Sequence, residues 1–127
     1  MTDAAALTHT DLKHIDDDAC RRFLSSAELV GRRWSSGIML AIFRGAHRFS
    51  AIVACVDGLS DRMAAQRLRE LEASGLVERT VIPSTPVQVR YELTQPGAEL
   101  LRSLQPLAAW AHRWGDVVGE PERAAAS

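Results

Sequence analysis

The fold is decided by residues 59–93, which read LSDRMAAQRLRELEASGLVERTVIPSTPVQVRYEL. Ser60 is a good helix N-cap, because its hydroxyl can accept a hydrogen bond from a backbone N–H of the first turn. Asp61 then places a carboxylate at the positive end of the helix dipole, and Gly75 suits the left-handed residue that follows many helices. A helix is therefore expected over residues 61–74.

This helix has two different faces. Its apolar residues recur at the spacing of one helix stripe, which predicts packing against a core; they are Ala64, Leu68 and Leu71. The opposite side carries Arg62, Gln66, Arg69 and Ala73. One side of the helix is thus expected to pack, and the other is expected to face outward.

Beyond Gly75 the periodicity changes from helical to alternating, which is typical of strands. Residues 87–93 place Val87, Val89, Tyr91 and Leu93 on one side, and Gln88, Arg90 and Glu92 on the other. Residues 76–82, which are rich in β-branched side chains, are the expected partner strand. Residues 83–86, PSTP, form the turn, because proline does not fit a strand interior. The prediction is a two-stranded hairpin over about 76–93.

Helices are expected upstream of this stretch. Residues 20–44 show a helical repeat that is interrupted around Gly31, which predicts two helices joined or kinked there. Residues 49–56 predict a further short helix, which ends at Asp57-Gly58 because this pair favours a turn.

Downstream, Thr94 can cap a last helix that Pro106 should kink or divide. The predicted fold class is mainly α with a small β-hairpin. At 127 residues the chain fits one domain of ordinary size, which we expect over residues 19–115. Residues 1–18 and 116–127 are expected to be flexible ends.

A short helix, a tight turn, a basic outward-facing helix and a hairpin form the outline of a winged helix-turn-helix. The major groove of DNA, ~12 Å wide, admits one α-helix. Arg62 could pair with guanine and Gln66 with adenine, each pair contributing ~1–3 kcal/mol of discrimination, while Arg69 suits a phosphate. On an isolated helix such a face would simply be solvated; the hairpin that follows favours DNA. The expected DNA contacts are Arg48, Ser60, Arg62, Met63, Gln66, Arg67, Arg69 and Arg90.

The charge distribution agrees with this interpretation. The net charge of −1 would by itself argue against a nucleic-acid partner. Residues 19–90, however, hold eleven arginines and six acidic residues, whereas residues 1–18 and 91–127 are net acidic. Segregation of this kind creates a local positive field that attracts phosphates even when the whole chain is near neutral.

The segment from Cys20 to about Leu101 resembles the HxlR-type regulators, winged-helix relatives of the MarR group. The resemblance is carried by Cys20, LVGRRW at 29–34, RFSAI at 48–52, LSDRMAAQRLRELEASGLVER at 59–79 and VIPSTPVQVRYELTQPG at 81–97. It implies a homodimeric DNA-binding regulator with N- and C-terminal dimerisation helices and a recognition helix that begins at Asp61. In some members a cysteine near the start, here Cys20, is a redox or electrophile sensor. This chain departs from the pattern at Arg21, where proline is common, and at the wing turn, which has no Lys or Arg at its tip.

The C-terminal helix carries an apolar stripe longer than a domain of this size needs for its own core, which also predicts a homodimer. The expected interface residues are Leu100, Leu104, Leu107, Trp110 and Trp114. A two-fold dimer predicts an inverted-repeat operator, with half-sites ~34–36 Å apart. The sequence identifies no particular effector, although the resemblance is compatible with a small molecule or an electrophile.

The two cysteines are expected to be reduced thiols. Cys20 lies near a predicted helix start and directly before Arg21 and Arg22, which favours the thiolate, whereas Asp16, Asp17 and Asp18 oppose it. The alternative is that Cys20 is a small apolar residue packed under the dimer helices. Cys55 is expected to lie in a helix core.

Other classes of protein fit less well. The four histidines are scattered, and neither a GxSxG motif nor a glycine-rich phosphate loop occurs, so we expect no enzyme, no cofactor and no metal site. No apolar run approaches the ~20 residues of a membrane span, and the start does not match a secretory signal, so we expect a cytoplasmic protein. A winged-helix protein-interaction or RNA-binding module without operator specificity remains the alternative.

Overall fold

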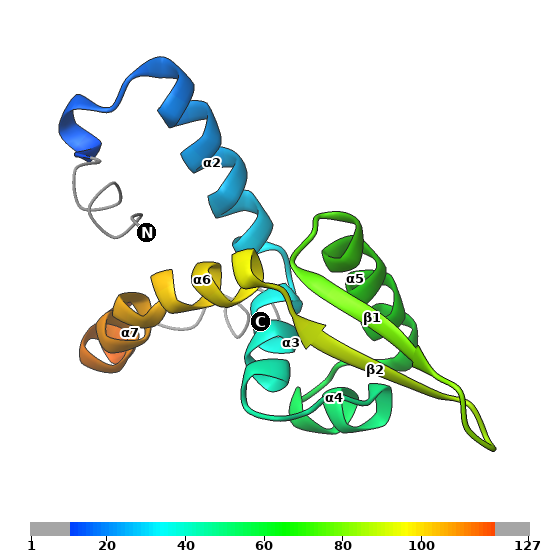
Figure 1. Cartoon of the computed structure of the whole chain (residues 1–127). Helices are drawn as coiled ribbons and strands as arrows, with labels where there is room; N and C mark the ends of the chain where they lie inside the picture. The colour runs from blue at the N-terminus through cyan, green and yellow to red at the C-terminus, as the bar shows by residue number, and fades with distance from the viewer. Residues whose placement is uncertain (1–10, 119–127) are drawn as a thin grey trace.

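The structure, a computed structural model, describes residues 11–118 and confirms the predicted class of mainly helical fold with one hairpin (Figure 1). Its elements are η1 (Leu12–His14), α2 (Asp17–Gly31), α3 (Ser35–Phe43), α4 (Phe49–Cys55), α5 (Asp61–Ala73), β1 (Val77–Ile82), β2 (Gln88–Leu93), α6 (Gln95–Ser103) and α7 (Gln105–Val118). Helix α2 starts two residues before the predicted domain, and α7 continues three residues beyond it. Residues 11–16 of the predicted flexible N-terminal end are described and contain η1, whereas residues 1–10 and 119–127 lie outside the described residues.

Helix α3 is the centre of the core. It packs against α2, α4, α5, α6 and β2, and most of its residues are apolar, as expected for a helix in the core. Leu40 and Phe43 are the apolar residues of α3 that stay exposed. The largest fully buried side chains come from α3, α4, α5 and β1; they are Ile38, Met39, Ile42, Ile52, Leu68, Leu71 and Val77. The predicted stripe of α5 is part of this core, so the helix lies with a defined face against the body.

The predicted caps form. The Ser60 hydroxyl oxygen accepts a hydrogen bond from the Met63 N–H at 3.1 Å, and Thr94 accepts one from the Gly97 N–H at 3.2 Å. Gly75 follows α5 with a φ of +80°, in the region where glycine avoids the Cβ clash. Gly97 is required for another reason: a Cβ there would lie 2.1 Å from the Leu76 carbonyl oxygen, where α6 crosses the start of the hairpin.

The hairpin is antiparallel, with Val77 opposite Leu93 and Ile82 opposite Gln88. Both strands begin one residue later than predicted. Tyr91 is buried, and its backbone N–H donates to the His47 carbonyl at 2.8 Å, while His47 Nδ1 lies 3.0 Å from the Tyr91 carbonyl oxygen. These bonds attach β2 to the turn between α3 and α4.

Two helical segments project from the body on the side away from the hairpin (Figure 1). Helix α2 contains no buried residue and ends at Gly31, where the sequence predicts an interruption. The C-terminal helix is divided at Leu104 into α6 and α7, which confirms the predicted break next to Pro106. We call α2 the arm.

The prediction for Cys55 was wrong, because its side chain is exposed. Helix α4 has seven residues and buries Ile52, and it ends at Cys55. The next residue, Val56, packs inward instead. Its side chain lies 3.4 Å from the position that a Cβ on Gly37 would occupy. The thiol is left on the surface beside the exposed Asp57-Gly58 turn.

Candidate nucleic-acid interface

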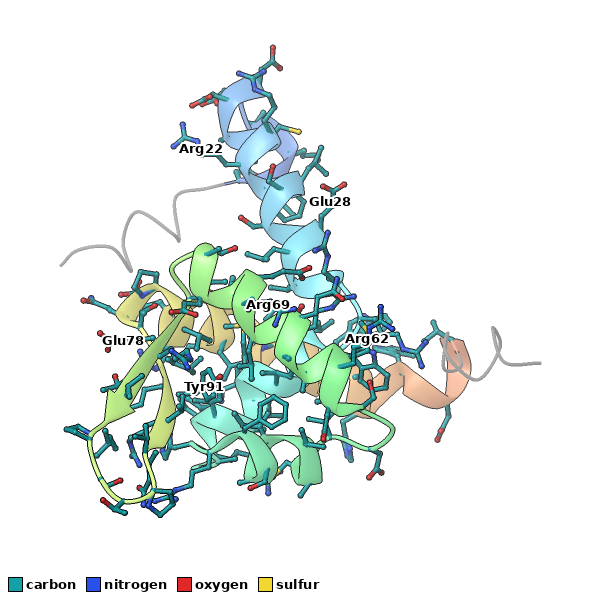
Figure 2. All side chains as sticks on the ribbon, turned by 90° about the vertical axis from the view of Figure 1, so that its right-hand side faces the viewer. Arg22, Glu28, Arg62, Arg69, Glu78 and Tyr91 are labelled. Carbon is teal, nitrogen blue, oxygen red and sulfur yellow. The ribbon has the colours of Figure 1, made fainter. Side chains whose placement is uncertain are left out.

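Helices α4 and α5 form a helix-turn-helix whose second helix presents a basic, solvent-exposed face. Ala64, Leu68 and Leu71 are at most 1% exposed and anchor α5 on the body. On the other side Arg62, Gln66 and Arg69 are exposed, as the helical period predicts. Figure 2 looks onto α5 and shows Arg62 and Arg69 spread along its outer side.

The start of α5 combines a cap with free donors. The Ser60 oxygen is occupied by the Met63 N–H, but the hydroxyl proton can still be donated to another acceptor. Met63 itself is partly buried and packs against the core. Ser60 is therefore available for a phosphate contact, whereas the Met63 side chain contributes mainly to holding the helix start in place.

Arg67 differs from the other arginines of α5. Its Nε donates to the Arg33 carbonyl at 2.9 Å, and its Nη1 donates to both carboxylate oxygens of Glu70, at 3.1 and 3.3 Å. The side chain is 13% exposed. In this structure Arg67 thus joins parts of the chain, and does not share the outward direction of Arg62 and Arg69.

Two other expected DNA contacts, Arg48 and Arg90, also have partners. Arg48 donates to the Gln88 amide oxygen at 2.6 Å, and Arg90 donates to Glu92 at 2.9 Å. Both lie at or next to the hairpin. The exposed side chains near the hairpin tip are uncharged, and Val87 and Val81 are 62% and 50% exposed. The exposed arginines among the expected DNA contacts therefore lie on the outer face of α5 and along β2, where Arg48 is bonded to Gln88, and not in the turn at residues 83–86.

Glu70 is a site residue that the sequence did not single out. Its Oε1 accepts a hydrogen bond from Arg32 Nη1 at 2.9 Å, and Oε2 lies 3.4 Å from the Gln66 amide nitrogen. The hydrogen bond from Arg32 lowers the pKa of Glu70, against the opposing effect of partial burial, and Gln66 and the Arg67 charge add to the lowering. The Arg67–Glu70 spacing of i,i+3 was a readable signal, but the link to Arg32 was not.

Cys20 lies near the start of the arm and is partly exposed. Arg21 is paired with Asp18 at 3.4 Å, and Arg22 is paired with the same carboxylate. The two cations that were expected to favour the thiolate therefore both interact with Asp18. The side chain of Asp16 caps the helix by accepting from the Ala19 N–H at 2.8 Å.

The apolar stripe of the C-terminal helices is divided between two roles. Leu100 packs against the core, whereas Leu107, Trp110 and Trp114 are 55%, 48% and 42% exposed. Leu104 and Leu107 line an open apolar groove of about 520 Å³ between α3, α6 and α7. The exposed part of the stripe is available for a partner.

Two further observations concern the described residues only. Between residues 11 and 118 no three His, Cys, Asp or Glu side chains are grouped so that they could hold a metal ion. Within the same range, none of the helices combines the length and the apolar character that crossing a bilayer requires.

A capped helix that packs one stripe and exposes a basic face, followed directly by a hairpin, defines a winged helix-turn-helix protein. The chain belongs to the HxlR-like helix-turn-helix family, whose model matches residues 29–118. It is a transcriptional regulator by this membership and by its relatives. The Bacillus subtilis regulator YvaP is 39% identical over 99 residues, which are 78% of this chain and 92% of YvaP.

The B. subtilis HTH-type transcriptional regulator YodB is also 39% identical, over 107 residues that are 82% of this chain and 96% of YodB. The crystal structure of diamide-treated YodB superposes with a TM-score of 0.64, covering 80% of this chain and 96% of that one, and quinone-bound YodB also gives 0.64, covering 74% and 99%. A MarR-family regulator from Enterococcus faecalis, 26% identical, superposes at 0.69 and covers 84% and 94%. These neighbours confirm the fold and the family resemblance.

Proposed function

We propose that this regulator binds duplex DNA sequence-specifically as a homodimer, with α5 in the major groove. The observation that carries the proposal is the face of α5 formed by Arg62, Gln66 and Arg69, which is exposed while the opposite stripe is buried. The dimension of one helix matches the groove, and residues near the start of a recognition helix reach base edges.

Each side chain on this face has a distinct role in the proposal. Arg62, in the first turn, pairs with a guanine, and Gln66, one turn later, contacts an adenine. Arg69 and the Ser60 hydroxyl contact phosphates and set the position of the helix without selecting sequence. Arg48, bonded to Gln88 at the turn end of β2, and Arg90, in the middle of that strand, add positive charge along the hairpin.

The proposed homodimer accounts for two surfaces that the single chain leaves uncovered. Helix α2 has fifteen residues and no buried residue, and its apolar side chains Phe23 and Leu24 are exposed. A helix of this length is only marginally stable in water unless its apolar face is covered. The stripe of Leu107, Trp110 and Trp114 is likewise exposed. Pairing of these helices with those of a second copy would cover both surfaces and create an inverted-repeat reader.

The decisive experiment measures binding of the purified protein to DNA that flanks its own gene, by gel shift and fluorescence anisotropy, against a scrambled sequence. Arg62→Ala is the test variant. Arg44→Ala, an exposed arginine outside α5 and the hairpin, is the matched control. Loss of discrimination in the first variant alone supports the proposal. Binding of RNA or of a protein with no DNA discrimination would favour the alternative module.

We also propose that thiol chemistry at Cys20 adjusts DNA affinity in the cytoplasm. Structures of the related YodB after diamide treatment and with bound quinone support this. The thiolate would add to a quinone carbon to form a thioether, or two thiols would lose two electrons and two protons to diamide as they form a disulfide. The exposure of Cys55 makes it available as a second thiol, contrary to the sequence-based expectation.

The test compares operator binding by wild type, Cys20→Ser and Cys55→Ser before and after diamide or a quinone. A response that disappears in Cys20→Ser supports the proposal. If Cys55→Ser also abolishes the response to diamide but not to quinone, the oxidised form is a disulfide between the two positions. Equal responses in wild type and Cys20→Ser would leave Cys20 as a packing residue.

A further inference from the structure

The turn between the arm and α3, residues 32–34, is attached to the recognition helix at two places. Arg32 Nη1 donates to Glu70 Oε1 at 2.9 Å, and Arg67 Nε donates to the Arg33 carbonyl at 2.9 Å. Glu70 and Arg67 are both on α5 and are bonded to each other. The base of the arm and the recognition helix are therefore connected by a continuous set of charge-assisted hydrogen bonds.

The same turn is also held against the turn of the helix-turn-helix. Trp34 has a φ of +79°, an uncommon conformation for a residue with a Cβ, and such a conformation persists only when the surroundings enforce it. The Trp34 ring lies 3.3 Å from the position that a Cβ on Gly58 would occupy. The Arg33 guanidinium carbon lies over the ring, 4.5 Å from its centroid. The arm thus cannot rotate about residues 32–34 without displacing the α4–α5 turn, α5 itself, or both.

Glu70 occupies the centre of this connection. Its two carboxylate oxygens face Arg32, which belongs to the arm turn, and Arg67 and Gln66, which belong to α5. The Gln66 amide nitrogen has two N–H groups, and Glu70 accepts a hydrogen bond from one of them at 3.4 Å, so the amide oxygen and the second N–H remain available to a base edge. This hydrogen bond restrains the orientation of the amide, so the carboxylate influences how Gln66 presents its acceptor and its remaining donor, and therefore which base Gln66 can contact.

We propose that Glu70 is a positioning residue for operator selection, which orients Gln66 and transmits the placement of the arm to the recognition helix without touching DNA itself. The inference rests on the proposed function of α5 as a DNA reader. It also provides the physical route by which a change near Cys20, on the arm, alters DNA affinity. A partly exposed ion pair adds little to stability, so a role in selection predicts that specificity changes more than stability does.

Glu70→Gln is the test variant, and Glu72→Gln is its matched control. Both remove one negative charge from α5, but Glu72 is exposed on the outer side of the helix end. The measurement is the ratio of operator to scrambled-DNA affinity at several salt concentrations. Both variants should bind all DNA somewhat more tightly. Only Glu70→Gln should lower the ratio, by about fivefold, the lower end of what one base-reading pair contributes.

Arg32→Ala tests the same connection from the arm side. If the arm acts through Glu70, Arg32→Ala should lower the ratio, and the double variant with Glu70→Gln should be no worse than Glu70→Gln alone. Thermal unfolding of each variant identifies any loss of fold, and Arg32, with a side chain 53% exposed, should tolerate replacement even if Glu70 does not.

The outcomes separate the two proposals. If Arg62→Ala leaves the ratio unchanged, the recognition-helix assignment itself is wrong. If Arg62→Ala lowers the ratio while Glu70→Gln and Glu72→Gln behave alike, α5 reads DNA and Glu70 has no positioning role. Additive losses in Arg32→Ala and Glu70→Gln would overturn the connection to the arm.

Discussion

Truncation of Leu107 should weaken the proposed dimer by an amount that follows from its exposure. Leu107 is 55% exposed on α7, beside the apolar groove. Full burial of a leucine contributes about 1.5–3 kcal/mol, so covering the exposed half contributes about 0.8–1.6 kcal/mol in each protomer. A two-fold dimer contains the residue twice, and Leu107→Ala should therefore cost about 1.6–3 kcal/mol of association free energy. This raises the dimer Kd about 15- to 150-fold.

Sedimentation velocity over a range of concentrations measures this directly. Leu107→Glu should have a larger effect, because a carboxylate would also have to be desolvated at the interface. Val81→Ala is the control, since Val81 is 50% exposed but lies on β1, outside the terminal helices. A wild-type chain that is monomeric at micromolar concentration, or a Leu107→Ala variant that dimerises as tightly as Val81→Ala, would show that this face is not the interface.

Three further outcomes are expected. Arg62→Ala should lose discrimination at one position of each half-site, whereas Arg69→Ala should weaken all sequences alike and reduce the salt dependence; the same change in both would contradict their assigned roles. Ser60→Ala should lower the free energy of unfolding in urea by about 1 kcal/mol, because the Met63 N–H loses its acceptor, and no change would mean that water replaces the cap. The pKa of Glu70 is lowered by folding, so its ionised form stabilises the protein above the ordinary carboxyl pKa, and this contribution is lost as the pH falls through the lowered value. The stability difference between wild type and Glu70→Gln should thus be constant from pH 6 to 8 and shrink on acidification, as unfolding at each pH would measure.

Much of the fold follows from short-range chemistry. Ser60 and Thr94 cap the helices that they were expected to cap, and the strand pattern around Tyr91 places its ring in the core. The division next to Pro106 likewise follows from the missing backbone N–H and the ring. These features depend on residues within a few positions of one another, so the sequence contains all that is needed to predict them.

The central part of the candidate site was also predictable. The exposed face of α5 follows from the helical period once the buried stripe of Ala64, Leu68 and Leu71 is recognised. Arg67 shows where this reasoning ends. Its position on the helix is compatible with an outward direction, but its guanidinium is bonded to the Arg33 carbonyl, 34 residues earlier in the chain.

The sequence by itself therefore determined the helices, their caps, the hairpin and the basic face of α5, because each depends on local periodicity and on hydrogen bonds within one turn. The tertiary structure alone decided the connection from Arg32 to Glu70, the exposure of Cys55 and the exposed surface of the arm. The connection from Arg32 to Glu70 forms only because the fold brings together two segments that are far apart in the sequence. The exposure of Cys55 depends on where α4 ends. A side chain at the end of a short helix is buried or exposed according to what packs over it, which no local pattern specifies.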